Sequence, residues 1–156
     1  MIVRQASPEE AYRLWNIRNL AIRHGCKQVY PADVIAAWTP DRMPVSFPAM
    51  IRENPFFVID GPDGEPVSTG ALDLAAASVE AIFTRPDCTG QGMAGLILDT
   101  LKAEARQRGY PQLTLASTPN AVSFYQRHGF RALGESLYPS KLAGSDLRCM
   151  EMAIAL

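Results

Sequence analysis

The sequence lacks any apolar run near the ~20 residues that a membrane-spanning helix needs. It begins Ile2-Val3-Arg4 after the first methionine, without the pattern of a secretory signal peptide. We therefore expect a cytoplasmic protein with no membrane partner. Internal repeats and low-complexity segments are also missing, and 156 residues leave room for one compact domain, residues 1–156, but not for a second.

No excess of charge of either sign is present, because 15 basic and 16 acidic residues give a formal net charge of −1. This balance argues against broad electrostatic capture of nucleic acid. Cysteine is scarce: Cys26, Cys88 and Cys149 are odd in number and lack metal-ligand spacing, so we expect reduced thiols and no metal. Cys88 lies beside a glycine-rich segment, where we expect it to act as a small apolar filler.

The pattern of apolar residues predicts a mixed α and β chain. Ser7-Pro8-Glu9-Glu10 is a capping box that predicts the start of a first helix, and Gly109 predicts the end of a later one. Four prolines between residues 40 and 55 predict an irregular segment. We expect strands at residues 2–6, 56–60, 67–74, 79–84, 113–115 and 130–137 and at the C-terminus, with helices after residues 7, 30, 92 and 118.

A glycine-rich loop directly precedes an amphipathic helix within residues 85–101. The free N–H groups and the dipole at a helix start favour a phosphate there. Gly90, Gly92 and Gly95 match Gly-x-Gly-x-x-Gly, but the lysine of a Walker loop is missing. A dinucleotide-binding oxidoreductase would need alternating βαβ units, whereas the central strands here are predicted to form hairpins. That alternative is therefore the least favoured.

A second segment, residues 121–130, has the sequence Ala-Val-Ser-Phe-Tyr-Gln-Arg-His-Gly-Phe and follows about one strand downstream. With the loop Thr89-Gly90-Gln91-Gly92-Met93-Ala94 and the strand before it, this segment resembles the GNAT superfamily of N-acetyltransferases. The family patterns are Gln/Arg-x-x-Gly-x-Gly/Ala and Ala-x-x-Phe-Tyr-x-x-x-Gly-Phe. The resemblance implies the acyl-CoA N-acyltransferase fold, a mostly antiparallel central sheet flanked by helices in the order βααβββαβαββ.

The resemblance also implies acetyl-CoA as co-substrate. The backbone of one strand would pair with the pantetheine arm, and one N–H there would face the thioester oxygen; by resemblance these positions are Ile82, Phe83 and Thr84. The backbone N–H groups of Thr89, Gly90, Gln91, Gly92, Met93 and Ala94 would bind the pyrophosphate. Thr89 replaces the family's Gln or Arg, so we expect weaker cofactor binding. The family's pantetheine-contacting asparagine is replaced by Thr118, with Asn120 two residues later; Thr118 is also suited to cap the following helix.

The family's tyrosine that protonates the departing thiolate corresponds to Tyr125. Helical spacing alone favours a core aromatic at Tyr125, and the surrounding Phe-Tyr-x-x-x-Gly-Phe motif reverses this in favour of the catalytic role. Glu80 is our first candidate for the general base and Asp73 the second, because both are predicted on strands near the cleft. Asp73 is also a candidate for substrate contact. His24 and His128 are weaker candidates, since a histidine at a helix C-terminus meets the dipole without any catalytic duty.

Substrate recognition is expected in the first helix pair. Residues 30–38, Tyr-Pro-Ala-Asp-Val-Ile-Ala-Ala-Trp, resemble a segment found in a subgroup of small bacterial acetyltransferases. Tyr30 and Trp38 could stack on an acceptor, or Trp38 could simply close the edge of the domain. We expect direct transfer of an acetyl group to a primary amine of a small molecule or peptide. The alternative is a non-catalytic coenzyme A-binding module for sensing or assembly. An exposed last strand could support a homodimer.

Overall fold

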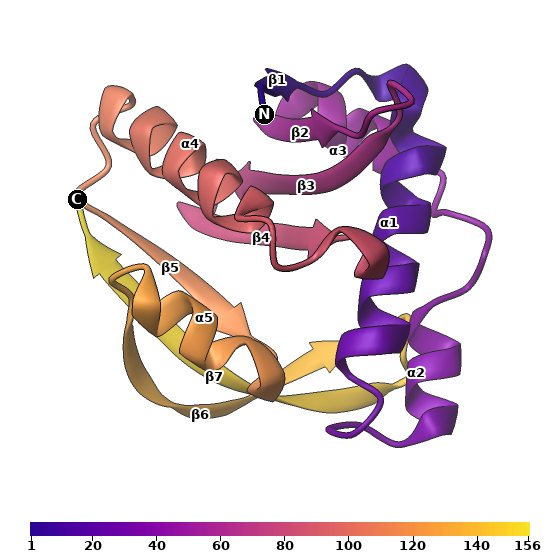
Figure 1. Ribbon diagram of the computed structural model, residues 1–156. Coiled ribbons are helices and arrows are strands. Elements are labelled where there is room, and N and C mark those ends of the chain that lie inside the picture. Colours follow the sequence, from indigo (N-terminus) through magenta and orange to yellow (C-terminus); the bar gives the residue numbers. More distant parts are fainter.

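The computed structural model describes residues 1–156 and consists of one mixed sheet with helices on both faces (Figure 1). The helices are α1 (Ala11–Gly25), α2 (Ala32–Trp38), α3 (Phe47–Glu53), α4 (Met93–Gln107) and α5 (Val122–Arg127). The strands are β1 (Val3–Gln5), β2 (Phe56–Asp60), β3 (Pro66–Asp73), β4 (Ser78–Thr84), β5 (Gln112–Ser117), β6 (Arg131–Ser140) and β7 (Ser145–Ala155). None of the helices combines the length and apolar character needed to span a bilayer.

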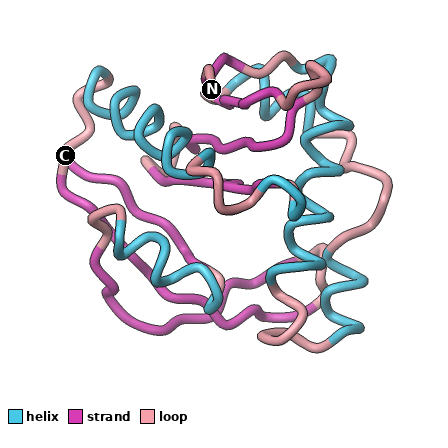
Figure 2. Tube along the Cα trace, in the orientation of Figure 1, coloured by secondary structure: helices cyan, strands magenta, loops and turns pink.

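The seven strands lie in the order β1-β2-β3-β4-β5-β7-β6. All neighbours are antiparallel except β4 and β5, which are parallel and share a single paired position, Ser78 with Thr114. Beyond that pair the two strands diverge, so the sheet opens into two halves (Figure 2). The predicted mixed fold with a mostly antiparallel sheet is confirmed.

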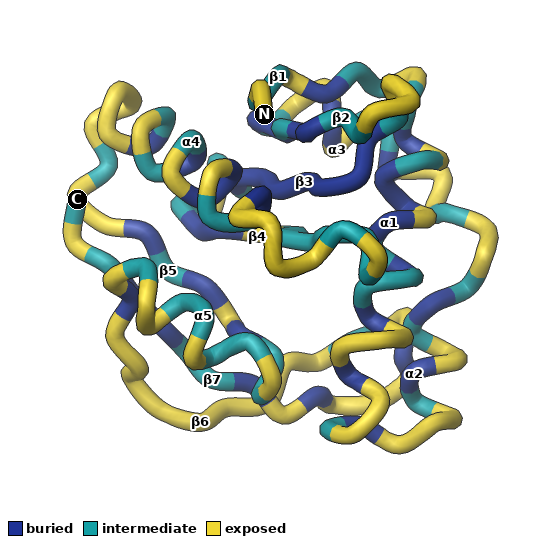
Figure 3. Tube along the Cα trace, in the orientation of Figure 1, coloured by how far each residue is buried: buried dark blue, intermediate teal, exposed yellow.

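Each face of the first half of the sheet has its own apolar core. On one face, α4 buries Ile97, Leu98 and Leu101 against the side chains of β2, β3 and β5. On the other face, α1 and α3 pack Leu14, Trp15 and neighbouring residues against Phe56 and Val58 of β2 and Ala71 of β3. Burial on both faces leaves β3 almost fully enclosed, whereas β6 is exposed along nearly its whole length (Figure 3). The predicted inward stripe of the helix after the glycine loop is confirmed from Ile97 to Ala105.

Two expectations about the chain are wrong. The proline-rich segment between residues 40 and 55 is not irregular throughout, because Pro48 lies in the first turn of α3, where its missing N–H costs no hydrogen bond. The last strand, β7, is not an exposed edge: it lies between β5 and β6, and β6 forms the edge. The sheet's two edge strands are β1 and β6, so a dimer formed through a sheet edge would use one of these and not β7.

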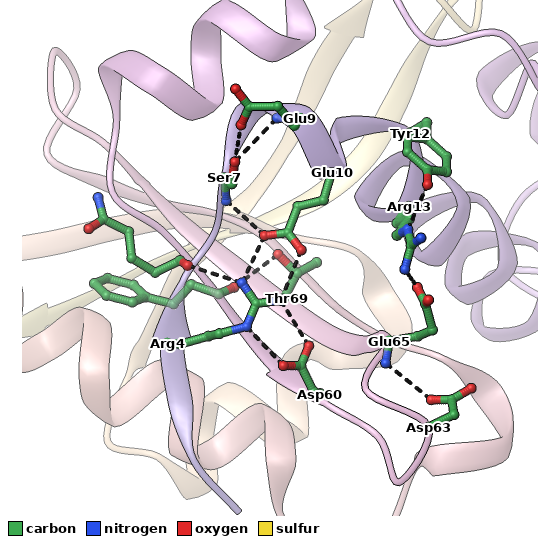
Figure 4. A network of polar contacts seen from close by, with 12 residues as sticks. Arg4, Ser7, Glu9, Glu10, Tyr12, Arg13, Asp60, Asp63, Glu65 and Thr69 are labelled. Carbon is green, nitrogen blue, oxygen red and sulfur yellow. Dashed lines mark hydrogen bonds and ion pairs between the residues drawn. The ribbon is translucent and has the colours of Figure 1, made fainter.

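A polar network joins the start of the chain to the first hairpin (Figure 4). The Arg4 guanidinium binds both Glu10 and Asp60 at 2.9 Å. The predicted capping box is present, because the Ser7 side chain and the Glu10 carboxylate each accept a backbone N–H of the same turn. Hydrogen bonds from Arg4 hold the pKa of both carboxyl groups below their usual range. This network fixes β1, the turn before α1, and β2 as one unit.

Candidate active site

The opening between β4 and β5 is the structural origin of the site. Past Ser78, the side of β4 that faces β5 has no strand partner, so its backbone groups are available to a ligand. The register between β3 and β4 also shifts between Thr69 and Ala71, and Ala81 opposite this shift has a φ of 56°. A non-glycine residue with positive φ in a strand marks a bulge that redirects the backbone, and such bulges are common beside active sites.

A cavity of about 270 Å³ occupies this opening. Its walls come from both faces of the sheet: Tyr125 belongs to α5 on one side, whereas Arg18 and Trp38 belong to α1 and α2 on the other. Glu80 and Phe83 of β4 line this cavity and also an adjoining one on the α1 side. Two molecules approaching from opposite faces could therefore meet between β4 and α5.

Glu80 and Tyr125, the candidate base and acid assigned from the sequence, both line this cavity. Partial desolvation by the cavity walls raises the pKa of Glu80, and nearby Asp73 adds to the effect while a hydrogen bond from Ser78 (3.0 Å) opposes it. Burial, with a smaller contribution from the Glu80 charge, raises the pKa of Tyr125 well above its usual value. Tyr125 packs edge-on against Phe124 and Phe130, while its hydroxyl donates no hydrogen bond within the protein. The arrangement leaves a protonated phenol and a basic carboxylate facing one space.

The glycine-rich loop forms a second cavity at the start of α4, lined mostly by glycines and polar or charged residues. The backbone N–H groups from Thr89 to Gly95 have no acceptor within the protein. Gly90 and Gly92 have φ values of 77° and 82°, and a side chain added at either position would meet nothing within 4 Å. Seven free N–H groups at the positive end of a 15-residue helix make a ready site for an anion such as a pyrophosphate.

The remaining residues predicted to bind the cofactor fall into two groups. Ile82 and Phe83 line the central cavity, and Thr84 lines the polar cavity of the loop, so β4 connects the two spaces. Met93 and Ala94 also line the loop cavity. Gln91 is exposed and does not line this cavity, so the structure does not bring it together with the other residues predicted to bind the cofactor.

Thr118 and Asn120 occupy different surroundings. Thr118 lines the central cavity and lies at the N-cap of the short turn Pro119–Ala121, although its side chain makes no capping hydrogen bond. Asn120 faces the end of α1 instead, where its amide oxygen accepts from the Cys26 thiol at 3.5 Å. Asn120 therefore ties α5 to α1 and lines neither the central cavity nor the loop cavity.

The three residues predicted for substrate contact lie on the α1 side. Tyr30 lines the central cavity with its ring, but its hydroxyl donates to the Arg148 carbonyl at 2.6 Å, and burial raises its pKa to about 12. Trp38 packs edge-on against Tyr30 and lines both adjoining cavities. Asp73 lines only the outer cavity, and its carboxylate accepts the N–H groups of the turn that follows β3. Asp73 is thus engaged in the fold, whereas Glu80 is freer to exchange a proton.

Sequence reasoning missed several residues that the tertiary structure adds to the walls. Arg18 and Tyr138 line both adjoining cavities, although α1 and β6 are far apart in the sequence. Arg127 and His128 line the loop cavity, and the His128 ring lies where a side chain at Gly95 would be. An arginine within the apolar stripe of the first helix was the one signal that could have identified Arg18. The three cysteines are free, and no group of three or more His, Cys, Asp or Glu residues could hold a metal ion.

Comparison of the sequence with known protein families identifies one family. A sequence model described as an acetyltransferase (GNAT) domain matches residues 26–153. An uncharacterized acetyltransferase of Streptococcus pyogenes serotype M1 is 35% identical over 74 residues, which are 45% of this chain and 51% of that protein. The chain thus spans about half the length of the curated relatives it matches.

Solved structures share the fold over nearly the whole chain. A GCN5-related N-acetyltransferase from Rhodopseudomonas palustris superimposes with a TM-score of 0.88 at 21% identity, covering 99% of this chain and 95% of that one. PaiA N-acetyltransferase from Thermoplasma acidophilum, solved in complex with coenzyme A, gives a TM-score of 0.78 at 16% identity, with 99% and 98% covered. At these identities the likeness shows the fold alone.

Proposed function

The chain belongs to the GNAT acetyltransferase family, and from this premise we propose that it transfers the acetyl group of acetyl-CoA directly to a primary amine of a small molecule or peptide. The observation that carries the proposal is the meeting of Glu80 and Tyr125 at a cavity that opens to both faces of the sheet. A base and an acid on opposite sides of one space are what amine acylation requires.

The proposed donor site fits the chain's own groups. Acetyl-CoA, when bound, supplies an activated acyl group as a thioester. The free N–H groups of Thr89 to Gly95 would hold its pyrophosphate, and Arg127 at the rim of the same cavity adds positive charge. The unpaired edge of β4, at Ile82, Phe83 and Thr84, would hold the pantetheine arm. Thr89 offers no side-chain hydrogen bond outward, because its hydroxyl donates to the Pro86 carbonyl at 3.1 Å.

In the proposed reaction Glu80 takes a proton from the acceptor amine, directly or through water, as the nitrogen bonds to the acyl carbon. The raised pKa of Glu80 makes it a better proton acceptor than a carboxylate with the usual pKa. Tyr125 gives its proton to the departing sulfur as the carbon–sulfur bond breaks, and its raised pKa keeps that proton in place until then. Backbone N–H groups of β4 at the Ala81 bulge would stabilise the negative charge that develops on the thioester carbonyl oxygen.

Calorimetric titration with acetyl-CoA, with NADH as the control ligand, tests the donor site, and thiol release in the presence of amines then tests transfer. Gly92→Ala and Gly64→Ala form a matched pair, because both glycines have φ near 80° and open space around them. Each change carries the same backbone strain of about 1 kcal/mol. Only Gly92→Ala places a methyl group in the loop cavity, so we expect it to weaken acetyl-CoA binding by at least tenfold while Gly64→Ala binds as wild type. Equal binding by wild type and both variants would remove the loop as the donor site.

A further inference from the structure

Arg18 is a cation on the α1 side of the site and forms no ion pair within the protein. It lies on α1 and lines both the central cavity and the adjoining one on the α1 side. The six ion pairs of the protein involve Arg4, Arg13, Arg23, Arg85 and Arg108, and Arg18 takes part in none of them. An arginine directed into a cavity without a carboxylate partner can bind an anionic group of a ligand.

Aromatic rings fix the orientation of this guanidinium. Its central carbon lies 4.2 Å from the ring centroid of Trp15 and 5.6 Å from that of Trp38. Only Nη1 is engaged, donating to the Asn19 side chain at 2.8 Å and to the Trp38 carbonyl at 2.9 Å. Nε and Nη2 donate to no acceptor within the protein. Two N–H-bearing nitrogens therefore remain for a planar, bidentate acceptor such as a carboxylate.

The electrostatic surroundings favour the same ligand. Desolvation lowers the pKa of Arg18 to about 10, opposed only by the nearby Tyr138. A positive charge that is partly removed from water and unpaired is unfavourable, and a bound anion would relieve that cost. The other charged groups lining these cavities are Glu80, Asp73 and Lys141. Of these, Asp73 already accepts two backbone N–H groups and Lys141 is exposed.

We propose that Arg18 binds a carboxylate of the acceptor, so that the substrate is a small amino acid-like molecule whose amine faces Glu80. The inference rests on the proposed acetyl transfer, because it assigns the acceptor class of the same site. Arg18 lines the cavity of about 270 Å³ and the adjoining one of about 730 Å³, which together leave room for a small acceptor beside the thioester. The aromatic walls of the smaller cavity, Tyr30, Trp38 and Tyr138, would cover the apolar part of such an acceptor.

The test compares amino acids that have a primary amine and an uncharged, non-aromatic side chain with their carboxamides, which keep the amine but lose the negative charge. We expect the wild-type kcat/KM to favour the acid over its amide by about 10- to 100-fold for the preferred acceptors, in line with hydrogen bonds to a charged group. Arg18→Gln should collapse this ratio, and Arg18→Lys should retain part of it. A ratio near one in the wild type, or one that survives in Arg18→Gln, would overturn the proposal, as would a loss caused by Lys141→Gln instead.

Arg23→Gln is the structural control. Arg23 lies on the same helix and also bonds the end of α2, at the Thr39 carbonyl (2.6 Å) and hydroxyl (3.1 Å), but it lines neither cavity. If Arg18 acted only by connecting α1 to α2, each of Arg23→Gln and Arg18→Gln would change the rates with acids and with amides by the same factor. We expect Arg23→Gln to leave the acid-to-amide ratio unchanged.

Binding without turnover separates this inference from the proposed function. The chain has only two tryptophans, Trp15 and Trp38, and both flank Arg18. Tryptophan fluorescence titrated with the same acids and amides, in the presence of coenzyme A, should therefore change with the acids in the wild type but not in Arg18→Gln. If no amine is acetylated yet this signal appears, acetyl transfer fails and the carboxylate site stands. If amines are acetylated but acids and amides give the same signal, the carboxylate site fails alone.

Discussion

Removal of the Tyr125 hydroxyl should lower the catalytic rate without changing the stability of the fold. The ring of Tyr125 is packed between Phe124 and Phe130, whereas its oxygen donates no hydrogen bond to any group of the protein. Tyr125→Phe therefore keeps the packing and removes only a group that faces the cavity. We expect the free energy of unfolding to change by less than about 0.5 kcal/mol, because no partner is left unsatisfied.

The expected loss of activity is much larger. A positioned general acid contributes about 10²- to 10⁴-fold to a rate, which is about 3–5 kcal/mol of transition-state stabilisation. The assay is thiol release from acetyl-CoA with a saturating amine, followed from neutral to alkaline pH. At neutral pH Tyr125→Phe should lose this factor in kcat, and at high pH it should approach the wild-type rate, because a thiolate leaving group then needs no acid.

Tyr110→Phe is the matched control. The Tyr110 hydroxyl donates to the Leu74 carbonyl at 3.3 Å, and Tyr110 lines neither cavity at the site. Its removal should cost about 0.5–1.5 kcal/mol. For a chain of this length that lowers Tm by a few degrees, about 2–4 °C per kcal/mol, with unchanged kcat. Full activity of Tyr125→Phe at both pH values would refute the assignment of Tyr125 as proton donor.

Two further predictions concern carboxyl groups whose pKa values are shifted in opposite directions. Glu80→Gln should lower kcat/KM by about 10²- to 10⁴-fold and abolish the acid limb of the pH profile. In the wild type this limb should lie above the usual carboxylate range, because desolvation at the cavity raises the pKa of Glu80. A larger loss of activity in Asp73→Asn would instead make Asp73 the base. Arg4 lowers the folded-state pKa of Glu10 and Asp60, so their contribution to stability is present above the unfolded pKa near 4 and is lost as the pH falls through the lower folded values. Urea unfolding of Arg4→Met between pH 7 and pH 3 should show a smaller loss of stability than the wild type, and identical slopes would contradict this origin.

Local sequence patterns determined most of the secondary structure. The capping box at Ser7 and the glycine loop before Met93 act within a few residues, so the sequence alone predicts where these helices begin. The same locality explains the error at Pro48, since a proline can either interrupt a helix or occupy its first turn. The family resemblance supplied Tyr125 and the phosphate-binding loop, because both belong to short contiguous motifs.

The tertiary structure alone decided which distant residues share the site. Arg18, Glu80 and Tyr138 come from α1, β4 and β6, and nothing in the local sequence joins them. Their meeting depends on the divergence of β4 from β5 after one paired position and on the insertion of β7 between β5 and β6. The fold also gives the Asp73 carboxylate and the Tyr30 hydroxyl hydrogen-bond partners on the backbone, so neither group is free to act on a substrate. Side-chain chemistry can be predicted from residue type, but the availability of a side chain depends on neighbours that only the folded chain supplies.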